Sequence, residues 1–394
     1  MYMALNQITT LCLAVTLFLI GSFLVKRIGF LNRYCIPAPV VGGLLFAILA
    51  TTLKSMGIVE ISLDTSLQSI FMITFFTTVG LGASFKLIKL GGKLLVIYWL
   101  ACGFLALMQN VIGVSLAQVL GLHPLLGVMA GAVSMEGGHG AAAAYGQTIE
   151  GFGVSSALSV GMAAATCGLV AGGLVGGPVV QHLIRKFNLK PAMEETEEYV
   201  EKDERPVTEK SFMVQVFLIT FCMALGTFIG EWFSNLTNFA LPGYVGAMFT
   251  AVIVRNIVDR INPHAINMKE IGLIGDISLG IFLSMALMSI KLWEVANLAL
   301  PLFVIILAQV IFIVLFAVFI LFRALGKNYD AAIMVSGFLG HGLGATPNAM
   351  ANMSAAVGKF GPSQKAYLIV PIVGAFLIDV FGMPIIITTI NLFK

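Results

Sequence analysis

Apolar runs of close to 20 residues recur along the whole chain, and they constrain its fold more than any other feature. A helix needs about 20 predominantly apolar residues to cross the hydrocarbon core of a bilayer. Only 10% of the 394 residues are charged and 59% are hydrophobic, whereas about a quarter of the residues in a soluble domain are charged. Because lipid offers no hydrogen bonds to the backbone, such runs form helices. The sequence therefore predicts an all-α integral membrane protein.

Hydropathy, with Gly, Pro and charged residues as breaks, predicts ten transmembrane helices. They lie near residues 7–25, 36–53, 66–85, 94–120, 154–184, 212–232, 241–258, 271–290, 297–322 and 364–390. Two glycine-rich segments are left over, 124–148 and 329–357, each between a fourth and a fifth span. We predict that both are re-entrant loops, which dip into the membrane and return on the side they entered.

The placement of positive charge supports this arrangement and orients it. With the N-terminus outside and both loops re-entrant, all but Lys54, Lys291 and Lys394 of the 22 Lys and Arg residues fall in cytoplasmic loops. Cytoplasmic loops of membrane proteins carry such an excess of positive charge. The C-terminus is then also outside, the first loop enters from outside, and the second enters from the cytoplasm.

Landmark residues recur at a separation of 205 positions. Pro37 and Pro242 open the second spans of two sets of five, and Gly121 and Gly326 precede the two loops. Because five spans is an odd number, the second half must be inverted relative to the first. The predicted parts are an N-terminal five-helix half, a polar cytoplasmic linker and a C-terminal five-helix half, at residues 1–186, 187–210 and 211–394.

The two loops carry the features of a binding site at membrane depth. In transporters with inverted repeats, the site lies where interrupted segments of the two halves meet near the midplane. Glycine lets the backbone approach a ligand closely, and half-helix N-termini present N–H groups to an anion. The alternative is that small residues only allow close helix packing, as we expect for "GGLVGGP" at 172–178. Polar residues at membrane depth favour binding in the two loops.

Several polar residues in or near the loops are candidate ligands. Glu136 is costly inside a membrane unless it meets water, a cation or a partner. His139 alone is as often a structural residue as a ligand. Asp379 lies within the last span, in a helix that nearby prolines should interrupt. Oxygen atoms suit a hard cation such as sodium, and the predicted sodium ligands are Thr346, Asn348, Asn352 and Asp379, with Pro347 expected to break the local helix.

At these residues the chain resembles the bacterial sodium/glutamate symporter family. The resemblance is carried by "GGHG" at 137–140 and "GLGATPNAMANM" at 342–353. It extends over nearly the whole chain, through "IPAPVVGGLL", "MALMSIKLWE", "GKNYDAA" and "VPIVGAFLIDV" in order. The chain departs from the family pattern at Glu136, where a small polar residue is common, at Ala141, where Thr is common, and at His341, where an aromatic residue is usual.

The resemblance implies sodium-driven import of L-glutamate across a bacterial cytoplasmic (inner) membrane. It also implies a homodimer that works by an elevator-like movement within the membrane lipids, with sodium as the coupling ion and with no other cofactor, no nucleic acid partner and no enzymatic activity. We predict that the substrate-binding residues are Glu136, Gly137, Gly138, His139, Gly140, Gly342, Gly344, Ala345, Thr346, Pro347 and Asn348.

Other classes of function stay open at this point. A proton- or sodium-coupled carrier of another amino acid or a dicarboxylate would fit the same pattern. A channel is disfavoured by the inverted halves with interrupted segments. A nucleotide-driven pump and a membrane hydrolase are disfavoured because the sequence has no GxxxxGK[ST] phosphate loop and no GxSxG motif.

Glu136 raises an electrostatic question for a glutamate carrier. Two negative charges about 4 Å apart repel by about 4 kcal/mol at an effective dielectric of about 20. Glu136 must therefore be protonated, help to hold a cation, or face away from the substrate. The sequence leaves the three possibilities open, and we favour a role in cation or proton coupling.

Overall fold

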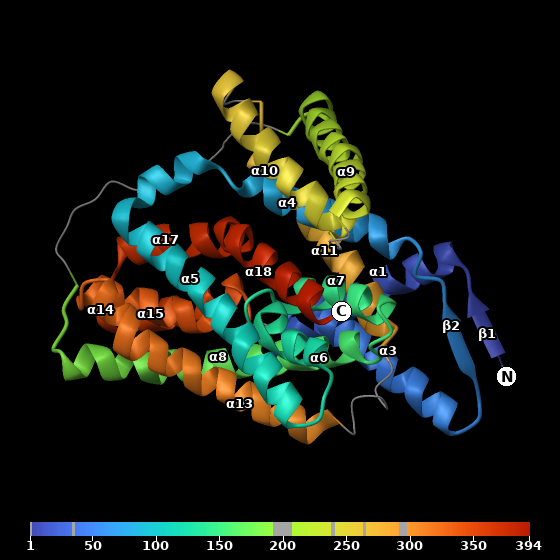
Figure 1. Ribbon diagram of the computed structural model, residues 1–394, viewed down its shortest axis with the longest axis horizontal. Coiled ribbons are helices and arrows are strands. Elements are labelled where there is room, and N and C mark those ends of the chain that lie inside the picture. The colour runs from blue at the N-terminus through green and yellow to red at the C-terminus, as the bar shows by residue number, and fades with distance from the viewer. Residues whose placement is uncertain (1, 34–35, 192–206, 238–240, 263–264, 291–297) are drawn as a thin grey trace.

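A computed structural model describes residues 2–33, 36–191, 207–237, 241–262, 265–290 and 298–394. Helices make up most of this part of the chain (Figure 1). Two four-residue strands, β1 (Tyr2–Leu5) and β2 (Glu60–Leu63), pair in parallel and are the exception to the predicted all-α architecture. Most of the predicted linker and Lys291 lie outside the described residues.

In the first half, helices lie at the predicted spans, and the segment predicted to be a loop is also largely helical. Their bounds are α1 (Gln7–Arg27), α2 (Gly29–Arg33), α3 (Ala38–Ser55), α4 (Gln68–Gly82), α5 (Phe85–Val119), α6 (Pro124–Val128), the π-helical segment η1 (Met129–Val133), α7 (Gly138–Gly151) and α8 (Ala157–Lys186). The segment at 124–148 is thus a pair of short helices joined by a turn.

The second half repeats this order. Its bounds are α9 (Glu209–Thr237), α10 (Gly243–Ile261), α11 (Met268–Met288), α13 (Ala299–Phe316), η3 (Ala317–Leu321), α14 (Phe322–Ala324), α15 (Tyr329–His341), α16 (Thr346–Phe360), α17 (Gln364–Ile372), η4 (Val373–Leu377) and α18 (Ile378–Phe393). Proline caps the start of both α3 and α10, at Pro37 and Pro242. Helices α6 and α15 begin at Pro124 and Tyr329, which keeps the separation of 205 positions.

Seven helices in the described residues are long and apolar enough to cross a membrane. They are α1, α3, α5 from Gly91 onwards, α8, α9, α11 and the continuous stretch from α13 to α14. Helix α4 is shorter, with 15 residues, and α10 carries Arg255, Asp259 and Arg260 near its end. The protein is therefore a multi-pass membrane protein, whereas ten crossings and re-entrant loops stay predictions.

The helices pack as two bundles, each drawing on both halves of the chain (Figure 1). The first bundle contains α1, α3, α4, α9, α10 and α11. The second contains α5 to α8 and α13 to α18. The main contacts between the bundles are those of α7 with α11 and of η4 with α4. Packing thus groups equivalent helices of the two sequence halves.

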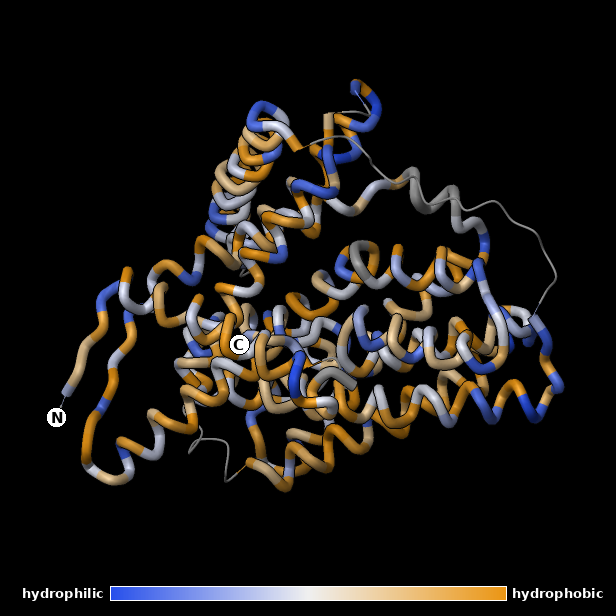
Figure 2. The backbone as a smooth tube through the Cα atoms, turned by 180° about the vertical axis from the view of Figure 1, so that it is seen from behind, coloured by the Kyte–Doolittle hydropathy of each residue, from blue (hydrophilic) through white to orange (hydrophobic). Residues whose placement is uncertain are grey.

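Segments that are predicted to be cytoplasmic meet one another at helix ends. At the end of α4, Ser84 donates a hydrogen bond to Asp259 of α10 at 2.5 Å. At the end of α8, the ring of Phe187 lies 5.4 Å from that of Phe322. Figure 2 shows hydrophilic residues gathered toward helix ends and apolar residues along the helices. This distribution agrees with helices that cross a membrane.

Candidate functional site

The two glycine-rich segments have the same local architecture, a helix, a turn and a second helix. In the first, η1 and the helical residues 134–135 lead into a turn at 136–137, and α7 begins at Gly138 with a φ of 61°. In the second, α15 ends at His341 and α16 begins at Thr346. We call these pairs hairpin 1 (124–151) and hairpin 2 (329–360).

The expectation that Pro347 breaks the helix is wrong. Pro347 lies in the first turn of α16, where its missing N–H would have no hydrogen-bond partner within the helix.

Helix α8 holds both hairpins along its length. Near its start, a Cβ on Gly146 of hairpin 1 would lie 2.6 Å from the Cα of Leu158. Near its end, the Nζ of Lys359 in hairpin 2 donates to Oε1 of Gln181 at 3.2 Å. The rise from residue 158 to residue 181 is about 35 Å, which is close to the thickness of the hydrocarbon core. The hairpins therefore approach from opposite ends of α8.

The turns of the two hairpins meet near the middle of α8. A Cβ on Gly168 would lie 2.5 Å from the carbonyl oxygen of Leu343 and 3.1 Å from the side chain of Met135, one neighbour from each hairpin. The turns also touch each other, since a Cβ on Gly138 would lie 2.6 Å from the carbonyl oxygen of Gly344. Only glycine fits at position 138, because its φ is positive and a backbone atom occupies the space.

Two acidic side chains line one small cavity beside these turns. Glu136 of hairpin 1 and Asp379 of α18 line a cavity of about 10 Å³, together with Tyr145 of α7. This volume corresponds to about one water molecule. Glu136 is 8% exposed, and its Oε1 has no hydrogen-bond partner among the described residues. An ionised carboxylate is costly to bury unless a cation or hydrogen-bond donors stabilise it.

The helix that carries Asp379 is not broken at its prolines as predicted, but it contains a widened, π-helical turn. The π-helical segment η4 lies between α17 and α18 and ends two residues before Asp379. A π-helical turn inside an α-helix often marks a functional site. Trp99 Nε1 donates to the carbonyl oxygen of Leu377 at 2.6 Å. At Gly374, an added Cβ would lie 2.8 Å from Thr346 Oγ1 and 2.5 Å from the ring of His341, so η4 packs directly on hairpin 2.

The predicted sodium ligands in α16 also fasten hairpin 2 to α8. Asn348 Nδ2 donates to the carbonyl oxygen of Leu169 at 3.0 Å, and Asn352 Nδ2 donates to that of Gly172 at 3.1 Å. Asn348 Oδ1 is buried and has no partner among the described residues. The amide nitrogens therefore stabilise the packing of hairpin 2 on α8.

His139 has a structural partner in this arrangement. Its Nε2 lies 3.0 Å from Oγ1 of Thr166 on α8, and the side chain is 5% exposed. On hairpin 2, the carbonyl oxygen of Gly342 accepts a hydrogen bond from Gln109 Nε2 at 2.7 Å. The backbone carbonyl oxygen of Gln109 in turn accepts a hydrogen bond from Gln309 Nε2 at 2.8 Å. These bonds fix both turns against α5 and α8.

Tyr145 and Thr166 were not among the predicted site residues. The spacing of Ala141 and Tyr145 places them on one face of α7, and both line the cavity with Glu136. The four-residue spacing from Ala141 is the sequence signal that could have identified Tyr145 as a site residue. Its ring also lies 5.5 Å from that of Tyr244 in a T-shaped contact, which joins hairpin 1 to α10 of the first bundle.

Sequence comparison decides the family of this chain. The sequence profile described as "Sodium/glutamate symporter" matches residues 3–362. The chain belongs to the sodium/glutamate symporter family. The sodium/glutamate symporter of Escherichia coli K12 is 41% identical over 389 residues, which cover 97% of this chain and 96% of the relative. That of Haemophilus influenzae Rd is 41% identical over 381 residues, covering 95% and 94% of the two chains.

Membership in the sodium/glutamate symporter family confirms the resemblance found in the sequence motifs. It makes this multi-pass protein a membrane transport protein, in agreement with its apolar helices. Among solved structures, the sodium proton antiporter MjNhaP1 of Methanocaldococcus jannaschii aligns over 98% of this chain and 96% of its own, with 14% identity and a TM-score of 0.45.

Proposed function

We propose that the protein is a sodium-coupled symporter that imports L-glutamate, with its binding site where the two hairpin turns meet. The observation that carries this proposal is the contact of Gly138 with the Gly344 carbonyl halfway along α8. There the N-terminus of α7 lies beside the N-terminus of α16. Both helix ends are partially positive and have N–H groups without partners in the helix. They suit the carboxylates of glutamate, the substrate that the names of the relatives state.

We propose that Glu136 and Asp379 form the coupling site. Two carboxyl groups on a cavity of about 10 Å³ would repel each other if both were ionised and nothing lay between them. A sodium ion would offset that repulsion, and its oxygen ligands would be completed by groups near the turns, such as Thr346 and Asn348. A shared proton is the alternative on the same pair, and it corresponds to a proton-coupled carrier.

The two bundles supply a route to alternating access. Because their mutual contacts are concentrated at α7 with α11 and η4 with α4, we propose that the hairpin bundle slides as a unit against the first bundle in an elevator-like movement. We further propose a homodimer in a bacterial cytoplasmic membrane, held through the first bundle. The first bundle includes α9, whose Phe217, Phe228 and Trp232 are exposed.

The membrane orientation predicts opposite accessibility for two equivalent positions. Val119 ends α5 and Ala324 ends α14, both are exposed, and they are 205 positions apart. On a cysteine-free background, Val119→Cys should react with an impermeant thiol reagent from outside and Ala324→Cys only from the cytoplasmic side. Reaction of both from the same side would contradict the inverted topology.

Uptake by the purified protein in proteoliposomes tests the function. An inward sodium gradient should drive accumulation of L-glutamate, and replacement of sodium by potassium should remove it. A panel of other amino acids and dicarboxylates, each assayed with a sodium and with a proton gradient, distinguishes the alternative carriers. Accumulation of a different acid, with none of glutamate, would reject the proposed substrate.

A further inference from the structure

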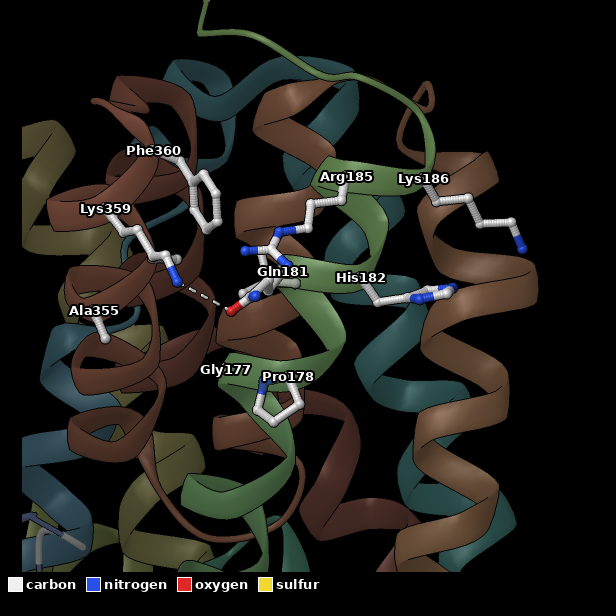
Figure 3. Close-up of a pocket in the computed structure, with 11 residues that line it drawn as sticks. Gly177, Pro178, Gln181, His182, Arg185, Lys186, Ala355, Lys359 and Phe360 are labelled. Atoms are coloured by element: carbon white, nitrogen blue, oxygen red, sulfur yellow. Dashed lines mark hydrogen bonds between the residues drawn. The ribbon is translucent and has the colours of Figure 1, made fainter.

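A cleft of about 780 Å³ lies between the last turns of α8 and α16 (Figure 3). Its walls include the apolar residues Pro178, Val180, Ala355, Ala356 and Phe360. From the start of α16 at residue 346 to residue 355 the helix rises about 14 Å. The cleft therefore ends short of the turns, and its occupant is not the substrate at the proposed site.

Two cations converge over this cleft. Figure 3 shows Arg185, Gln181 and Lys359 pointing toward one another, whereas His182 and Lys186 point to the other side of α8. Lys359 Nζ donates to Gln181 Oε1 at 3.2 Å. Among the described residues that line the cleft there is no Asp or Glu.

Helix stability alone does not explain why the side chains of Arg185 and Lys359 point into the same space. Basic residues in the last turn of a helix are stabilised by the helix dipole, which explains why Arg185 and Lys359 lie where they do. It does not explain why the two side chains face the same space, because like charges repel. An anion between them would remove the repulsion, and guanidinium and ammonium groups are the usual partners of phosphate.

We propose that the cleft binds the headgroup of an anionic phospholipid, with its phosphate between Arg185 and Lys359. On α8, exposed Leu174 and Pro178 precede Arg185, and on α16 exposed Ala355 precedes Lys359. Both helices thus present apolar residues followed by a cation, which matches an acyl chain followed by a phosphate. The cleft opens at the predicted cytoplasmic end, where anionic lipids attract basic residues. Its volume is in the range of sites for whole organic ligands.

Lipid retention measured by native mass spectrometry tests this site independently of transport. The purified protein is exchanged into mixed micelles containing phosphatidylglycerol and phosphatidylcholine. The parent should retain phosphatidylglycerol selectively, and the Arg185→Gln/Lys359→Gln variant should bind it about 30-fold more weakly, at about fivefold per cation. The matched control is Lys26→Gln/Arg27→Gln, in the last turn of α1 on the same predicted face, which should retain the lipid as the parent does.

Competition distinguishes the lipid from a free anion. Inorganic phosphate or L-glutamate at the same concentration as phosphatidylglycerol should not displace it, since neither has an acyl chain. Displacement by either would assign the cleft to a soluble anion and overturn the proposal. Equal lipid retention by the cleft variant and the control variant would also overturn it. If the double variant does not fold, Lys359→Gln alone should show the fivefold loss.

Discussion

Gly138→Ala is expected to reduce sodium-driven glutamate uptake by at least about 100-fold while the folded protein remains in the membrane. The added Cβ would lie 2.6 Å from the carbonyl oxygen of Gly344, so the two turns must move apart. A displacement of about 1 Å at a reacting or binding centre can cost about 100-fold in rate. The measurement is initial uptake in proteoliposomes, normalised to the amount of protein inserted.

Gly153→Ala is the matched control for this substitution. Gly153 has a φ of 90°, so alanine there incurs a comparable backbone strain of about 1–2 kcal/mol, but no atom lies within 4 Å of the added Cβ. This variant should fold and transport nearly as the parent does. Uptake at the parental rate by Gly138→Ala would mean that the contact between the turns only fills space.

Glu136→Gln is expected to raise the half-saturating sodium concentration for uptake by at least about tenfold. The substitution keeps the shape of the side chain but removes a charge from the cavity that Asp379 shares. An ion and a carboxylate about 4 Å apart attract by about 4 kcal/mol at an effective dielectric of about 20, so loss of a fraction of this energy produces the expected change. If the pair binds a proton instead, the pH profile of uptake shifts and the sodium titration does not.

The control for Glu136→Gln is Glu231→Gln, which removes an exposed carboxylate from α9 in the first bundle. It should leave both the sodium titration and the pH profile unchanged. A Glu136→Gln variant whose two curves overlay those of the parent, at equal expression, would exclude Glu136 from coupling.

The sequence was sufficient to predict features that follow from local chemistry. Hydropathy placed a helix at each predicted span in the described residues, and the prolines at 37 and 242 do cap helices. The glycines at 138 and 344 were predicted to allow close backbone approach, and their backbones do touch. The helix of Asp379 was predicted to be interrupted, and it contains the π-helical segment η4 instead of a break.

Features that depend on packing could not be predicted. Glu136 and Asp379 are more than half the chain apart, and no periodic pattern shows that they share a cavity. The division into two bundles is also hidden, because helices facing lipid and helices facing one another are similarly apolar. Tyr145 was not predicted as a site residue, and its contacts with the cavity and with Tyr244 depend on how α7 packs against other helices.

The affinity for L-glutamate as a function of sodium concentration tests most directly whether the carboxyl pair couples the two ligands. Coupling between two binding sites is reciprocal, so sodium must tighten glutamate binding if glutamate tightens sodium binding. Isothermal titration of the purified protein should show a Kd for glutamate that falls as sodium rises, and a Kd that no longer depends on sodium in Asp379→Asn. The same sodium dependence in the parent and in Asp379→Asn would contradict a coupling site at Glu136 and Asp379.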